Sequence, residues 1–103
     1  LSDKIDLLTS GGGALSAPTS LSRLADNSTA TTKDTLATAM FNGLIANGAS
    51  LCLATNAAFG GKVFLAINDA TQAYSSTTDL FVELTGISSL PSLGTITVTN
   101  LFI

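Results

Sequence analysis

Three oxygen-bearing side chains stand at the two ends of one loop and are able, as a set, to ligate a metal ion. Asn68 and Asp69 follow one alternating apolar run, and Asp79 precedes the next. Calcium takes six to eight oxygens from carboxylates, amides and backbone carbonyls, so these residues are candidate calcium ligands. The same residue types also build turns, in which Asn68 and Asp69 form an Asx-turn and Asp79 accepts from loop amides. The sequence leaves both interpretations open.

The groups used most often in catalysis are nearly missing from the sequence. The chain has no His and a single Cys, which excludes a Ser–His–Asp triad and an internal disulfide and nearly excludes a zinc site. Cys52 lies in an apolar run, where a small buried side chain is expected. We therefore expect a protein that is not an enzyme.

The charge balance and the apolar runs exclude two kinds of partner. Four basic residues stand against seven acidic ones, for a net charge of -3, and no basic stripe exists to bind nucleic acid. The apolar runs are far shorter than the roughly 18 residues that a membrane-spanning helix needs. We expect neither nucleic-acid binding nor membrane insertion.

Two strands are predicted to hold the loop that carries the candidate ligands. Residues 62–67 and 80–84 alternate their side chains with a period of two, which is typical of strands. Both faces of each strand are rather apolar, so we expect cover on both sides of the sheet. Gly60 and Gly61 predict a two-residue hairpin between the first strand and residues 57–59.

The rest of the second half of the chain is also expected to be β structure. Residues 49–53 are predicted to be a strand or a buried linker, and residues 95–103 a final strand with Ile96 and Val98 on one face. The region 49–103 is thus predicted to be a mostly antiparallel β region.

One helix is predicted over residues 31–47. Thr31 is the expected N-cap, with Asp34 in capping-box spacing, and Asn47 and Gly48 are the expected left-handed stop. The helix carries an apolar stripe that should face the core. That stripe consists of Leu36, Ala37, Met40, Phe41, Leu44 and Ile45.

The first thirty residues are predicted to be an entry segment. A short strand is expected at 3–8, followed by a glycine turn at 11–13. Residues 14–30 read as irregular, with room for a short helical turn near residues 21–25. We expect the 103 residues to be one domain, or a fragment of a larger protein, of mainly β structure with one packed helix, an α+β fold.

Residues 62–86, KVFLAINDATQAYSSTTDLFVELTG, resemble the C-terminal bluetail domain of cyanobacterial and proteobacterial surface proteins. Residues 3–7, DKIDL, look like the strand that follows the calcium-binding β-roll of RTX proteins. The resemblance covers about residues 1–8 and 57–103 and implies an antiparallel β-sandwich or a domain that caps a β-roll. The family pattern is carried here by Asn68, Asp69, Thr71, Tyr74, Thr78, Asp79, Thr85 and Gly86.

The resemblance also implies a function in export. In that family the domain ends a large, acidic, Cys-poor exported protein, and its terminus is the address for type I secretion. Here that address is Leu101, Phe102 and Ile103, although Asn100 stands where the family often has an acidic residue. The resemblance predicts a structural, secretion-associated domain outside the bacterial cell, packed against the rest of its parent protein, with calcium as the candidate cofactor.

Two alternatives stay open. Only 11% of residues are charged, and such a surface with strand edges also suits a self-assembling subunit of an extracellular fibre or surface layer. Its partners would be copies of itself. A carbohydrate- or ligand-binding module needs exposed aromatic side chains, and a chain with no Trp and one Tyr, Tyr74, argues against it.

Overall fold

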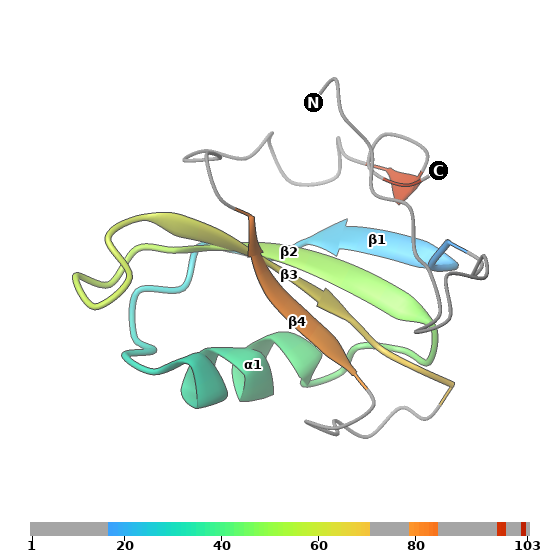
Figure 1. Cartoon of the computed structure of the whole chain (residues 1–103), viewed down its shortest axis with the longest axis horizontal. Coiled ribbons are helices and arrows are strands. Elements are labelled where there is room, and N and C mark those ends of the chain that lie inside the picture. The colour runs from blue at the N-terminus through green and yellow to red at the C-terminus, as the bar shows by residue number, and fades with distance from the viewer. Residues whose placement is uncertain (1–16, 71–78, 85–96, 99–101, 103) are drawn as a thin grey trace, which may run out of the picture.

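The computed structural model describes residues 17–70, 79–84, 97–98 and 102 (Figure 1). In chain order their elements are β1 (Ser20–Arg23), α1 (Lys33–Phe41), β2 (Gly48–Ala54), β3 (Lys62–Ile67) and β4 (Leu80–Leu84). The strands form one sheet in the order β1-β2-β3-β4, and α1 covers one face of it. β1 is parallel to β2, whereas β2–β3 and β3–β4 are antiparallel.

This arrangement confirms a mainly β domain with one packed helix. The sheet is mixed rather than purely antiparallel, because β1 adds a parallel strand to an antiparallel set. The described residues supply one sheet, so the sandwich that the resemblance implied is not among them. The strand predicted at 3–8 and the glycine turn at 11–13 lie outside the described residues.

β3 and β4 have the bounds that their alternation predicted. They pair with Leu65 opposite Val82 at the centre of the register. Because side chains alternate across a strand, Phe64 and Ala66 of β3 face the helix side of the sheet, and Val63 and Leu65 face the other side. Each strand therefore contributes to two separate cores.

β2 is the partner of β3, and the predicted two-residue hairpin is wrong. Residues 57–60 form a turn instead of a strand, because Asn56 accepts from Phe59 N–H at 2.9 Å and its side chain accepts from Ala58 N–H at 2.9 Å. Gly60 and Gly61 still adopt left-handed φ values of 67 and 81°. Residues 49–53 belong to a strand rather than to a linker.

The helix begins one residue later than the capping box predicted. Thr32 is the N-cap, and its Oγ1 accepts from Thr35 N–H at 3.2 Å. Thr31 therefore does not cap the helix, and Asp34 lies in the first turn, where its charge favours the helix dipole.

The helix also ends earlier than the predicted range of 31–47. It stops at Phe41, and Gly43 follows with a left-handed φ of 76°. Asn47 has the left-handed φ that was predicted, 59°, but in the turn before β2 rather than at the helix end. Ile45 lies beyond the helix and is 53% exposed, so its place in the apolar stripe is wrong.

The first core fills the space between α1 and the sheet. Phe64 stacks on Phe81 with ring centroids 5.2 Å apart and meets Phe59 edge-on at 5.4 Å. Such aromatic pairs add about 0.5–1.5 kcal/mol beyond the burial of their area. The helix contributes the predicted stripe residues Leu36, Ala37, Met40 and Phe41, all buried. The predicted stripe residue Leu44 is also buried, but it lies in the segment after the helix.

The second core lies on the opposite face of the sheet, which confirms that the sheet is covered on both sides. Its buried members are Ala49, Leu51, Val63, Leu65 and Phe102. Val98, Ala17, Leu21 and Val82 are partly buried against them. Ala17, which precedes β1, thus shares this second core with Val98 and Phe102, which follow β4.

Two predicted elements near the ends of the described chain differ from the structure. Residues 20–23 form β1 rather than a helical turn, since pairing with β2 places Leu21 on the second core. The strand predicted over 95–103 is wrong at Val98, which is helical and whose C=O accepts from Phe102 N–H at 2.9 Å. This four-residue spacing puts both side chains on the same side.

The buried hydroxyl of Ser50 provides a test of this fold. Ser50 is fully buried in β2, and its Oγ has no hydrogen-bond partner among the described residues. A buried polar group without a partner is costly, so Ser50→Ala should raise the free energy of unfolding by about 1 kcal/mol in urea denaturation. Ser22→Ala is the matched control, because Ser22 is the exposed register partner of Ser50 on β1. A loss of stability in Ser50→Ala would contradict the burial of an unpaired Ser50 hydroxyl.

Candidate functional site

Asn68 joins the end of β3 to the turn between α1 and β2. Its side chain is buried, and its Nδ2 donates to Leu44 C=O at 3.1 Å and to Ile45 C=O at 3.4 Å. Its backbone N–H donates to Gly48 C=O at 2.8 Å. Asn68 is therefore committed to two backbone segments, and its amide nitrogen holds the turn in place.

The structure brings Asp69 and Asp79 together from the two ends of the loop. The backbone N–H of Asp69 donates to Asp79 Oδ1 at 3.0 Å, and the C=O of Asp69 accepts from Asn47 N–H at 2.7 Å. Asp79 thus makes the hydrogen bond to a loop amide that the turn interpretation predicted. The carboxylate closes the mouth of the loop just before β4 begins.

Calcium binding at this position stays a prediction. In the described part of the chain, no three His, Cys, Asp or Glu residues gather as they would around a metal ion. Asp69 and Asp79 alone supply two carboxylates, and a calcium shell needs six to eight oxygens. Residues 71–78 of the loop, which include Tyr74, lie outside the described residues.

Of the predicted secretion tail, the described part of the structure contains Phe102. Its side chain is 3% exposed and packs in the second core with Leu51, Val63 and Leu65. This core lies on the face of the sheet away from α1. Leu101 and Ile103 lie outside the described residues.

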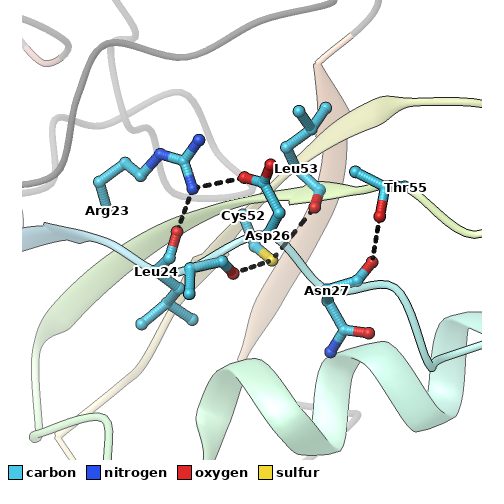
Figure 2. Close-up of polar contacts among 8 residues, drawn as sticks. Arg23, Leu24, Asp26, Asn27, Cys52, Leu53 and Thr55 are labelled. Carbon is cyan, nitrogen blue, oxygen red and sulfur yellow. Dashed lines mark hydrogen bonds and ion pairs between the residues drawn. The ribbon is translucent and has the colours of Figure 1, made fainter.

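A polar cluster that the sequence did not predict fastens the segment after β1 to β2 (Figure 2). Arg23 Nη1 lies 2.8 Å from Asp26 Oδ1 and also donates to Leu24 C=O. The Arg23 side chain is only 10% exposed, so the ion pair neutralises a charge that would otherwise be buried alone. Cys52 Sγ donates to Ala25 C=O at 3.5 Å.

Asn27 completes this cluster and directs the chain toward α1. Its N–H donates to Leu53 C=O at 2.9 Å and its C=O accepts from Thr55 N–H at 2.8 Å. Its Oδ1 accepts from Thr29 N–H at 3.1 Å and from Ala30 N–H at 2.9 Å. An Asn followed by Ser and Thr is a known turn signal, so this part of the cluster was detectable in the sequence.

The cluster is unsuited to nucleophilic chemistry. Burial raises the pKa of the Cys52 thiol, with smaller opposing contributions from the hydrogen bond to Asn27 and the charge of Arg23. A reactive cysteine needs the opposite, a lowered pKa that favours the thiolate. Cys52 is buried as predicted and acts as a small packing residue whose thiol makes weak hydrogen bonds to Ala25 C=O and Leu53 C=O.

Comparisons of the chain with protein-family models, with curated proteins and with solved structures give no match. Among the described residues, no helix has both the length and the apolar character to cross a membrane.

Two substitutions at Asp79 separate its hydrogen bond from its charge. Asp79→Ala removes the acceptor for Asp69 N–H and should lower the free energy of unfolding by roughly 1 kcal/mol. Asp79→Asn keeps a carbonyl oxygen at the same position, so its free energy of unfolding should fall by about half as much. Urea denaturation measures both. Equal losses would show that the charge, and not the acceptor, stabilises the loop.

The same Asp79→Asn variant tests the calcium hypothesis. Calcium ligation depends on carboxylate charge, and a ligand that binds only the folded state raises the melting temperature. Millimolar calcium should therefore raise the melting temperature of the wild type and leave that of Asp79→Asn unchanged. Magnesium is the control ion. A wild-type melting temperature that is the same in calcium and in chelator rejects a calcium site at Asp69 and Asp79.

The raised pKa of Cys52 predicts a pH dependence of stability. The unfolded thiol ionises near its ordinary pKa of about 8.5, whereas the folded thiol keeps its proton to higher pH. The unfolded state therefore binds fewer protons between these two pKa values, and stability falls as pH rises. From pH 8 to 10 the wild type should lose more stability than Cys52→Ala in urea denaturation. A constant difference between the two proteins across this range would contradict the prediction.

Proposed function

We propose that this chain is a non-enzymatic structural domain of an extracellular bacterial surface protein. In this proposal the domain lies at the C-terminal end of its parent protein and is exported by type I secretion machinery through the segment Leu101, Phe102 and Ile103. The domain then folds outside the cell and packs against the rest of the parent.

The burial of Phe102 is the observation that carries the proposal. Its side chain is 3% exposed in the second core, so it is accessible to a partner only while that core is open. The apolar tail is thus exposed in the unfolded chain and Phe102 is buried in the folded one. This suits a secretion signal that the exporter binds before the domain folds. Burying a Phe side chain stabilises the folded state by about 1.5–3 kcal/mol. Folding outside the cell therefore opposes the return of the exported chain.

The sequence supports a role without catalysis. The chain has no His, and its single Cys is a buried thiol with a raised pKa. The ion pairs Arg23–Asp26 and Lys62–Glu83 join elements of the fold to one another. These charges serve the packing of strands and of the segment after β1.

Export from a bacterium that carries a type I exporter tests the proposal. Deletion of Leu101, Phe102 and Ile103 should lower the exported fraction of the chain at least about tenfold, a difference of about 1.4 kcal/mol in recognition. The exported fraction is measured by immunoblot of the medium and of the cells.

A matched variant distinguishes recognition of the tail from loss of folding. Phe64→Ala removes a fully buried ring from the first core and should cost about 3–5 kcal/mol of stability, while the tail stays intact. This variant should still be exported. If Phe64→Ala blocks export as strongly as the deletion does, the defect lies in folding, and the tail is not the address.

A further inference from the structure

β4 is an edge strand of the sheet. It pairs with β3 on one side, and among the described residues no strand pairs with its other side. Every residue of β4 is partly exposed or exposed, and Leu80 reaches 41%. The unpaired N–H and C=O groups of such an edge are a template for another strand.

The two edges of the sheet differ in how well they are protected. β1 has the sequence SLSR, with two Ser residues and an arginine that is paired with Asp26. β4 has the sequence LFVEL, with no Lys or Pro to block pairing and one acid, Glu83. The β4 edge is therefore the more apolar and the less protected of the two.

The helix leaves room beside β4. α1 packs on β2 and β3 (Figure 1), and its closest described ring contact with β4 is Phe41 to Phe81, with centroids 6.5 Å apart. A strand added beside β4 would therefore lie beyond the part of the sheet that α1 covers. Leu80, Val82 and Leu84 face away from α1, on the side of the second core.

Symmetry limits how a second copy can pair with β4. Antiparallel pairing of identical strands needs a two-fold axis perpendicular to the sheet, and opposite residues must share a face. The axis must then pass through a residue pair, and three positions keep most of β4 paired: Phe81, Val82 and Glu83. Each of these positions sets a different register.

The acidic residues select one of these three registers. An axis at Glu83 puts Glu83 directly opposite its own copy, and an axis at Phe81 puts Asp79 opposite Glu83. Like charges in opposite positions destabilise a strand pair. An axis at Val82 avoids both and pairs all five residues of β4.

We propose that two copies of this chain associate through β4, antiparallel, with Val82 opposite Val82 of the second copy. Leu80 then lies opposite Leu84, and Phe81 lies opposite Glu83. The two four-stranded sheets become one continuous sheet with both helices on the same face. The row of Leu80, Val82 and Leu84 continues across the junction and joins the two second cores.

This inference rests on the structural role proposed above and supplies the contact for self-assembly. Its test is carried out on the purified chain in solution, so it can fail while the export experiment succeeds, and the reverse also holds. Sedimentation equilibrium of the wild-type chain should show a monomer–dimer equilibrium.

Cysteine crosslinking tests the register. In the Cys52→Ala background, Val82→Cys should form a disulfide dimer on mild oxidation, because opposite Cα atoms in an antiparallel pair lie about 4.5–5.5 Å apart and disulfides span about 4.4–6.8 Å. Leu84→Cys is the matched control, since two copies of residue 84 would lie about 13 Å apart along the strands. A mixture of Leu80→Cys and Leu84→Cys chains should crosslink with each other.

Three outcomes would overturn the proposal. If the wild-type chain stays monomeric at millimolar concentration, two copies do not associate through β4. Equal crosslinking of Val82→Cys and Leu84→Cys with themselves would indicate random collision. Failure of the mixed pair to crosslink would exclude this register. Thermal unfolding of each reduced variant confirms that it is folded before oxidation. Sedimentation equilibrium of the wild-type chain tests dimer formation even if a cysteine variant fails to fold.

Discussion

The structure depends on the burial of β2, in which every residue except the partly exposed Leu53 is buried. This strand lies between β1 and β3, so both of its edges are hydrogen-bonded, and both of its faces are covered. Its helix-facing residues are Gly48, Ser50, Cys52 and Ala54, all small, which lets α1 approach the sheet closely. The bulk on that face comes instead from Phe64 of β3 and Phe81 of β4. Tight packing of this kind requires large side chains to face small ones.

The parts of the fold that the sequence predicted well are those fixed by local pattern. β3 and β4 alternate with little interruption, and their bounds follow from that alternation. The helix was predicted too long because its apolar spacing continues past Gly43, where a left-handed residue ends the helix whatever the spacing beyond it. β1 was missed because its strand state comes from parallel pairing with β2, more than twenty residues later in the sequence.

The candidate site shows the same division between local and distant contacts. The meeting of Asp69 and Asp79 was predictable, since an antiparallel pair must bring the two ends of its loop together. The ion pair of Arg23 with Asp26, and its position over Cys52, depend on how the segment after β1 crosses β2 (Figure 2). No periodicity in residues 14–30 indicates that crossing, and only the turn at Asn27 leaves a signal.

The position of Phe102 has a consequence for the order in which the two faces of the sheet close during synthesis. The described members of the first core end at Phe81, whereas those of the second core extend to Phe102. A nascent chain can therefore pack α1 on the sheet while the other face of the same sheet still lacks one of its buried rings. For that interval the chain presents Leu51, Val63 and Leu65 on an incompletely covered face of the sheet.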